Sequence, residues 1–140
     1  MPDLAADRDA IRDLLARYTY NGDRGRLTEL AACFLPDGML EYPGASPVGP
    51  AGIAAALSAG PADPGRTFVR HHIANPLVEV DGDSAVARSY FAVVSNAGPD
   101  HSGTYDDRLI RSTAGWRFAH RRVRIDWQAE TSLWPRMASR

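Results

Sequence analysis

The pattern of apolar residues changes at Thr67, and this change limits the folds that the chain can adopt. Before Thr67 the apolar residues recur at helical spacing, whereas after it four segments are rich in β-branched and aromatic residues. These four candidate strands cover 67–80, 84–95, 103–112 and 115–127. Helical segments followed by a meander of long strands are typical of an α+β fold, in which the helices cover one face of an antiparallel sheet.

Three helices are expected in the first half of the chain. The first covers about 4–21, because its apolar residues share one helical face. Those residues are Ile11, Leu14, Leu15 and Tyr18. A second helix runs through Phe34 to a turn at 36–38, and a short strand follows at 39–42. A third helix, rich in alanine, covers about 50–59.

Turn sequences join the candidate strands. Short turns at 81–83 and 113–115 indicate tight hairpins, and 96–100 indicates a longer turn. No repeat, low-complexity tract or linker interrupts this pattern. We therefore expect residues 1–140 to form one domain.

The charges exclude several classes of partner. Sixteen arginines face seventeen acidic residues, which gives a net charge of -1 and no overall field toward nucleic acid or anionic lipid. The chain has no lysine, which together with its alanine, glycine and proline content favours a GC-rich, bacterial genome. Residues 1–20 carry too many charges for a signal peptide, and no apolar run approaches the roughly 20 residues that span a membrane. Neither nucleic acid nor a membrane is expected as a partner.

Cysteine, histidine and glycine usage bears on location and cofactors. Cys33 is the single cysteine, so an internal disulfide is excluded and a reducing cytoplasm is expected. His101 and His120 lack partners at the spacing typical of metal ligands, so no metal is expected. The glycine-containing loops lack the order of a phosphate-binding loop, so we expect no nucleotide and no other cofactor.

One histidine is expected to face the helices. Side chains alternate between the two faces of a strand, and a single face holds Val69, His71, Ile73 and Asn75. The apolar members of this set place His71 and Asn75 on the covered face, and His72 on the other. Taken alone, His71 is interpreted as a core histidine that bonds to a backbone carbonyl.

Asp23 also has two interpretations. It follows the first helix and can cap the second, or it can bond to His71. Tyr18 favours the bond to His71, because it continues the buried stripe of the first helix and can face the same cavity as Asp23. A carboxylate on one imidazole nitrogen fixes the tautomer and makes the other nitrogen more basic. A nearby phenol can donate a hydrogen bond to a carbonyl oxygen.

Other residues fall into an ordered pattern. The helical half contains Arg17-Tyr18, Asp23, Phe34, Pro36-Asp37-Gly38 and Gly49-Pro50. The sheet half contains Arg70-His71-His72, Asn75, 80–85, Ser89-Tyr90-Phe91, 103–107 and 115–118. Over roughly residues 5–127, the order and spacing of these motifs resemble SnoaL-like domains of the nuclear transport factor 2-like superfamily.

The resemblance implies a cone-shaped half-barrel with three N-terminal helices packed on a curved antiparallel sheet. It implies a core of about 5–127 and a C-terminal tail at 128–140. Asp23 and His71 match the Asp-His pair of its dehydratase and dehydrochlorinase branch, and Tyr18 matches a tyrosine of the dehydratases. We expect further residues to line the substrate pocket, namely Tyr42, Asn75, Phe91, Tyr105 and Trp127.

Two functions are compatible with this pattern. One is a cofactor-free dehydratase, cyclase or isomerase that acts on a small apolar carbonyl compound, such as a polyketide-like or steroid-like ring. The other is a non-catalytic binder of small molecules, or a partner subunit of the same fold. The second gains support because bile-acid-type enzymes have a further aspartate on a later strand, and this chain has only the hydrophobic Val93 and Val94 near that position. The steroid-isomerase mechanism is disfavoured, since Tyr42 stands in place of its base.

The remaining features concern the surface and the tail. Arg121, Arg122 and Arg124, like the charges at 105–108, are interpreted mainly as ion pairs at the surface. A homodimer or higher homo-oligomer is expected, because Tyr90 and Val94 would otherwise be exposed on the outer face of the sheet. The tail can pack across a pocket mouth or a neighbouring subunit, or be disordered, and Trp134 favours packing.

Overall fold

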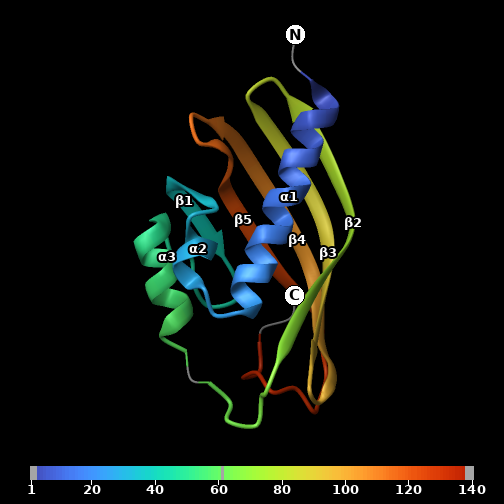
Figure 1. Ribbon diagram of the computed structural model, residues 1–140. Coiled ribbons are helices and arrows are strands. Elements are labelled where there is room, and N and C mark those ends of the chain that lie inside the picture. Colours follow the sequence, from blue (N-terminus) through green and yellow to red (C-terminus); the bar gives the residue numbers. More distant parts are fainter. Residues whose placement is uncertain (1–2, 61, 138–140) are drawn as a thin grey trace.

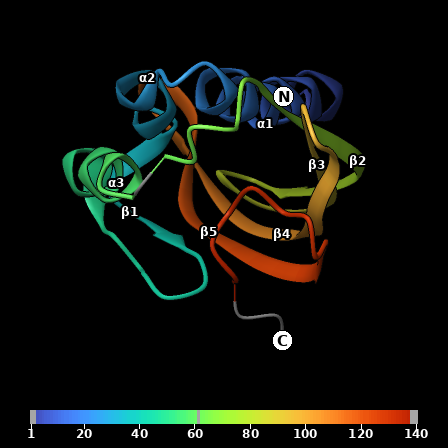
Figure 2. The same ribbon diagram turned by 90° about the horizontal axis from the view of Figure 1, so that it is seen from below.

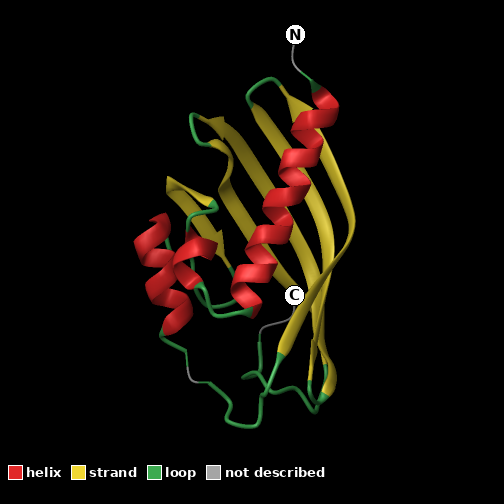
Figure 3. Ribbon diagram, in the orientation of Figure 1, coloured by secondary structure: helices red, strands yellow, loops and turns green. Residues whose placement is uncertain are grey.

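The computed structural model describes residues 3–60 and 62–137. Its elements are α1 (Leu4–Asp23), α2 (Leu27–Ala31), β1 (Phe34–Glu41), α3 (Gly49–Ser58), β2 (Val69–Asp81), β3 (Ser84–Ser95), β4 (Gly98–Ser112) and β5 (Gly115–Gln128). The strands form one sheet in the order β1-β5-β4-β3-β2 (Figure 1). All three helices lie on the same side of this curved, unclosed sheet (Figure 3), so the α+β fold with covering helices is confirmed.

The apolar stripe of α1 explains how the helix attaches to the sheet. Asp3 caps the helix by accepting a hydrogen bond from the Ala6 amide at 3.1 Å. Ile11, Leu14 and Leu15 are almost completely buried against the inner side of the sheet. Each such side chain stabilises the fold by about 1.5–3 kcal/mol when it leaves water. This packing fixes the position of the last turn of α1.

None of the helices in the described ranges is long and apolar enough to cross a bilayer.

The segment after α2 differs from the sequence-based expectation. The helix ends at Ala31, and Phe34 begins β1 instead of continuing the helix. β1 pairs in parallel with β5, so the sheet is mixed and not purely antiparallel. Phe34 lies opposite Phe118, with ring centroids 5.1 Å apart, and this tertiary contact outweighs the local helical pattern. The expected turn at 36–38 is an irregularity within the strand, where Pro36 has no N–H to donate.

Two bulges change which face of the sheet a side chain occupies. The pairing of β2 slips between Ala74 and Leu77, where Asn75 has a left-handed φ of 55°. A bulge inserts an extra residue and shifts the alternation of all residues beyond it. Asn75 is consequently exposed, and its expected place beside His71 is wrong.

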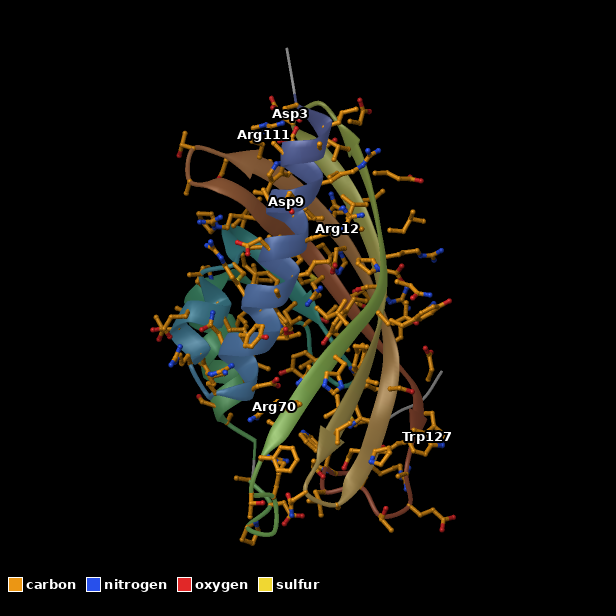
Figure 4. The ribbon with its side chains drawn as sticks, turned by 45° about the vertical axis from the view of Figure 1, so that its right-hand side comes forward. Asp3, Asp9, Arg12, Arg70, Arg111 and Trp127 are labelled. Atoms are coloured by element: carbon orange, nitrogen blue, oxygen red, sulfur yellow. The ribbon has the colours of Figure 1, made fainter. Side chains whose placement is uncertain are left out.

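Trp127 is displaced in the same way. The pairing of β4 with β5 slips between Ser102 and Gly103, which lie opposite Trp127 and Ile125. Ile125 is buried, whereas Trp127 is 50% exposed. Figure 4 shows Trp127 on the side of the sheet that faces away from the helices. The expectation that Trp127 forms a pocket or core wall is therefore wrong.

The hairpin between β3 and β4 is tighter than expected. The turn contains only Asn96 and Ala97, because Ser95 already pairs with Gly98. Residues 98–102, which were expected to lie mostly in a turn, therefore belong to β4. At the same end of the molecule lie the last turn of α1, the loop that precedes β2, and the C-terminal segment (Figures 1 and 2).

Candidate functional site

A cavity of about 550 Å³ lies between α1, the inner face of the sheet and the C-terminal segment. Pockets for small organic ligands usually have volumes of roughly 300–1,000 Å³. Its lining is mostly apolar and aromatic and comprises Tyr18, Leu40, Tyr42, Pro43, Gly44, Leu57, His71, Phe91, His101, Tyr105, Val123, Ile125, Trp134, Pro135, Arg136 and Met137. The structure thus brings together five of the sequence-predicted residues: Tyr18, Tyr42, His71, Phe91 and Tyr105. Asn75 and Trp127 lie outside this lining.

Asp23 holds His71 by two hydrogen bonds. Its Oδ1 lies 2.5 Å from Nδ1 of the His71 ring, and its Oδ2 accepts the His71 backbone N–H at 2.9 Å. Asp23 is the last residue of α1, and its side chain is only 5% exposed, whereas the His71 side chain is 25% exposed. Because a carboxylate oxygen accepts hydrogen bonds, this contact favours the tautomer with the proton on Nδ1, which leaves Nε2 for the cavity.

Both alternative interpretations of this pair are excluded by the geometry. The N-cap of α2 is Arg26, and no side-chain hydrogen bond caps that helix, so Asp23 is not a helix cap. His71 bonds through its ring to a carboxylate and not to a backbone carbonyl. The pair therefore has the arrangement of a histidine whose orientation and tautomer are set by a fixed anion.

A second Asp-His pair lies in the same cavity, and sequence reasoning missed it. Nδ1 of His101 lies 2.7 Å from Oδ1 of Asp100, and the two side chains are only 6% and 1% exposed. Pairing of β3 with β4 slips between Val93 and Val94, which lie opposite His101 and Pro99. Asp100 is the extra residue of this bulge, and bulging lets adjacent side chains approach each other. In a regular strand, adjacent side chains point to opposite faces, so strand alternation argues against this pair. The sequence signal that remains is that Asp100 and His101 are neighbours.

The C-terminal segment holds Asp100 in place. Ser132 Oγ donates to Oδ1 of Asp100 at 2.6 Å, and the Leu133 amide donates to Oδ2 at 2.8 Å. Burial favours the neutral acid, but hydrogen bonds from Ser132, His101 and Leu133 outweigh it and hold the pKa of Asp100 below its ordinary value. Burial lowers the pKa of His101, and the Asp100 charge opposes this only in part. His101 is thus a neutral imidazole near pH 7.

The C-terminal tail forms one wall of the cavity, in agreement with the packing that Trp134 led us to expect. The Trp134 ring meets the His101 ring edge-on, with centroids 5.0 Å apart. Cζ of Arg66, from the loop before β2, lies 4.2 Å from the centroid of the Trp134 ring, and the Arg66 guanidinium donates to the Leu133 carbonyl. Residues 129–137 are therefore anchored to both the sheet and a loop. Residues 138–140 lie outside the described residues.

The two imidazoles occupy one row of the inner sheet face. His71 of β2 pairs with Val93 of β3, which pairs with His101 of β4. Adjacent strands lie about 4.8 Å apart, so the backbones that carry the two rings are separated by roughly 10 Å. The ring of Phe91 lies between them, at centroid distances of 6.4 Å and 6.2 Å. Both imidazoles therefore line the same cavity, beside one shared aromatic ring.

Three phenols add further polar groups to the cavity, which is also lined by Arg136. Burial raises the pKa of Tyr18, Tyr42 and Tyr105, so each remains a protonated donor at neutral pH. Tyr105 stacks on Phe91 at 4.4 Å, and Gly103 permits this because a Cβ there would meet the Phe91 ring at 2.8 Å. Across 3–60 and 62–137, no group of three or more His, Cys, Asp or Glu side chains is arranged to hold a metal ion.

Comparisons with known proteins agree with this architecture. The family model for SnoaL-like domains matches residues 3–122. No curated protein matches the chain. Among solved structures, Rv3472 from Mycobacterium tuberculosis, a protein of unknown function solved as a variant, shares 35% identity. That match covers 84% of this chain and 70% of the other, with a TM-score of 0.73.

Two further structures, both from Novosphingobium aromaticivorans, are similar in fold. One is described as an NTF2-like protein with a cystatin-like fold, and shares 28% identity with a TM-score of 0.78 over 92% of this chain and 88% of the other. The second is a candidate scytalone dehydratase, with 22% identity and a TM-score of 0.79 over 96% of this chain and 93% of the other.

Proposed function

This chain belongs to the SnoaL-like family of the nuclear transport factor 2-like superfamily, and we propose that its cavity binds a small, largely apolar carbonyl compound and transfers a proton on it without a cofactor. The observation that carries this proposal is the Asp23–His71 pair, in which a buried carboxylate fixes a half-buried imidazole at the cavity wall. The reaction class is that of a dehydratase, cyclase or isomerase. The candidate scytalone dehydratase of the same fold is compatible with this class.

His71 is the proposed general base. Its Nε2 takes a proton from a carbon next to the ligand carbonyl, and the Asp23 charge stabilises the imidazolium that forms. A positioned base of this kind contributes roughly 10²–10⁴-fold to a rate. Asp23 acts by orienting the ring and by stabilising its charged form.

Tyrosine hydroxyls are proposed to hold the ligand oxygen. Proton removal next to a carbonyl moves negative charge onto its oxygen, and a phenol fixed in an apolar cavity stabilises that charge. Tyr18 and Tyr105 lie close together, with ring centroids 6.0 Å apart. Tyr42 lines the same cavity from the end of β1.

His101 is proposed to bind a hydroxyl group of the ligand or a water molecule. With Nδ1 bonded to Asp100, its Nε2 is an acceptor that faces the cavity. A ligand with a carbonyl near His71 and a hydroxyl that donates to His101 can lose water within reach of His71: His71 takes the proton from carbon, the C–O bond breaks as the double bond forms, and the His71 imidazolium returns its proton to the departing oxygen. This arrangement supports the dehydratase type over a simple isomerase.

The test is solvent deuterium exchange. A panel of apolar ketones and hydroxyketones is incubated with the protein in D₂O, and exchange of the protons next to the carbonyl is followed by NMR. We expect at least one compound to exchange or lose water faster with the wild type than with His71→Gln or Asp23→Asn. The matched control is His72→Gln, since His72 lies on the same strand but is exposed. Wild-type rates in both His71→Gln and Asp23→Asn would refute the mechanism.

One observation favours the alternative, a non-catalytic binder of the same fold. Val93, near the position of the further aspartate in bile-acid-type enzymes, is an almost fully buried apolar residue. Such a cavity binds its ligand through apolar contacts and the phenols, without turnover. Saturable binding of panel compounds with no exchange in the wild type would favour this function.

Self-association through the outer sheet face is also proposed. Leu77, Val86 and Tyr90 are 60%, 48% and 58% exposed there. Exposed apolar groups gathered on one face are typical of an interface. A dimer mass in native mass spectrometry that becomes a monomer mass in Tyr90→Arg is the expected result, and a monomeric wild type would refute it.

A further inference from the structure

A charged pair without access to solvent lies behind the cavity tyrosines. Arg121 of β5 pairs across the sheet with Asp107 of β4, and both side chains are 0% exposed. The contact is bidentate: Nε donates to Oδ1 at 2.8 Å and Nη2 donates to Oδ2 at 2.9 Å. The interpretation of these charges as surface ion pairs is therefore wrong for this pair. The Asp107 charge outweighs the effect of burial and raises the pKa of Arg121, which stays charged.

Three aromatic rings surround the guanidinium. Its Cζ lies 3.8 Å from the ring centroid of Tyr105, 4.3 Å from that of Tyr18 and 4.4 Å from that of Phe118. Nη1 is buried and has no hydrogen-bond partner among the described residues. Tyr18 and Tyr105 line the cavity, whereas Arg121 does not, so the rings separate the charge from any ligand.

Stability alone does not explain this pair. Taking two charges out of water is costly, and apolar residues of similar volume usually stabilise a core at least as well as a buried ion pair. A cation held against a ring face, however, attracts the electron density of that ring. It makes the phenol a stronger hydrogen-bond donor, and the effect is large where water is excluded.

The orientation of the Arg121–Asp107 pair relative to the phenols matters as much as its presence. Burial raises the pKa of Tyr18, the Arg121 charge opposes this, and the more distant Asp107 charge adds to it less strongly. The positive end of the pair thus faces the phenols. The negative end lies on the far side of the guanidinium, which donates two hydrogen bonds to it.

We propose that Arg121 is a positioning residue that acts through Tyr18 and Tyr105, and makes their hydroxyls a site for an oxygen that carries or gains negative charge. The ligand class is therefore an enolisable ketone or an acidic phenol, and not a neutral hydrocarbon or ether. This inference deepens the proposed function and shares its ligand site, but it concerns binding and requires no turnover.

The test compares ligands that differ in acidity. Dissociation constants are measured for a series of para-substituted phenols, with 4-nitrophenol as the most acidic, and for 4-nitrotoluene as a neutral analogue of similar shape. The proteins are the wild type and Arg121→Met/Asp107→Leu, which replaces both charges with apolar side chains. In the wild type we expect affinity to rise with phenol acidity.

In the double variant we expect affinity for 4-nitrophenol to fall about tenfold and the dependence on acidity to flatten, because the desolvated charge is gone. Affinity for 4-nitrotoluene stays within a factor of two to three, since the cavity keeps its shape. Arg88→Gln/Asp106→Asn is the matched control, because it removes an ion pair from the same sheet on its exposed side. It keeps the wild-type dependence.

Three outcomes would overturn the inference. The double variant could lose affinity equally for both ligands, which would indicate a structural role, or it could keep the wild-type dependence on acidity. The third is a wild type that binds none of the phenols. If the apolar variant does not fold, Arg121→Gln/Asp107→Asn removes the charges with nearly the same shapes, and the same comparison applies. Phenol binding that depends on Arg121 in a protein without exchange activity would reject the proposed catalysis alone. Exchange activity with a flat acidity dependence in the wild type would reject this inference alone.

Discussion

The two Asp-His pairs of the cavity are built in different ways. Asp23 and His71 are 48 residues apart, and their contact joins the end of α1 to β2. Asp100 and His101 are neighbours in a bulge, and the C-terminal segment supplies two further donors to their carboxylate. The first pair is therefore part of the packed frame of the fold. The second depends on the position of a tail.

This difference separates their chemical roles. The His71 side chain is 25% exposed and can meet a ligand directly, whereas that of His101 is 6% exposed and sits beneath Trp134. A proton carrier must be reachable and able to stabilise its charged form. His71 fits that requirement, and His101, whose charged form is disfavoured by burial, fits that of a neutral hydrogen-bond acceptor.

The largest expected effect tests which histidine moves the proton. For a compound found by the exchange screen, we expect His71→Gln to lower the exchange rate by about 10²–10⁴-fold. His101→Gln should act mainly on binding and raise KM more than it lowers kcat. A larger loss of exchange in His101→Gln than in His71→Gln would reverse the roles of the two pairs.

A smaller effect tests the dependence of the second pair on the tail. Asp100→Asn leaves donors from Ser132 and Leu133 poorly matched, and we expect a loss of about 1–3 kcal/mol in the free energy of unfolding. Urea unfolding measures the loss, and amide hydrogen exchange at Leu133 should become faster. Asp23→Asn is the comparison, because it should leave the Leu133 amide protected. Equal protection in both variants would show that Asp100 does not anchor the tail.

The smallest effect concerns pH. Because burial lowers the pKa of His101 in the folded state, the unfolded chain binds a proton at this residue more readily. Its contribution to stability is present above the unfolded pKa of about 6.5 and is lost as the pH falls from there through the folded pKa. The stability difference between wild type and His101→Gln should therefore shrink below about pH 6.5. A difference that grows on acidification would contradict the shift.

The regular parts of the sheet explain why one pair could be predicted from sequence. From Val69 to Ala74, β2 keeps its pairing with β3, so alternation placed His71 on the covered side and His72 on the other. The periodicity of α1 likewise placed Tyr18 at the cavity. Local patterns suffice where the backbone is regular.

The failures occur where the pairing slips. Asn75, Trp127 and the Asp100–His101 pair each lie at or beside a bulge, and a bulge is set by contacts between distant segments. Phe34 likewise lies in a strand and not in a helix, because it packs against Phe118, which is distant in sequence. Burial of Arg121 also depends on three rings brought together from α1, β4 and β5. Most of these partners are far apart in sequence; the exceptions are Asp100 with His101, and Phe118 with Arg121 on the same strand.

The central claim is that Asp23 holds Nδ1 of His71 so that Nε2 can take a proton, and ¹⁵N NMR of the imidazole nitrogens tests it most directly. At a pH where the ring is neutral, we expect the proton on Nδ1 and a bare Nε2, and a mixture of tautomers in Asp23→Asn. A wild-type His71 with its proton on Nε2 would contradict the claim, because the nitrogen that faces the cavity could then no longer act as a base.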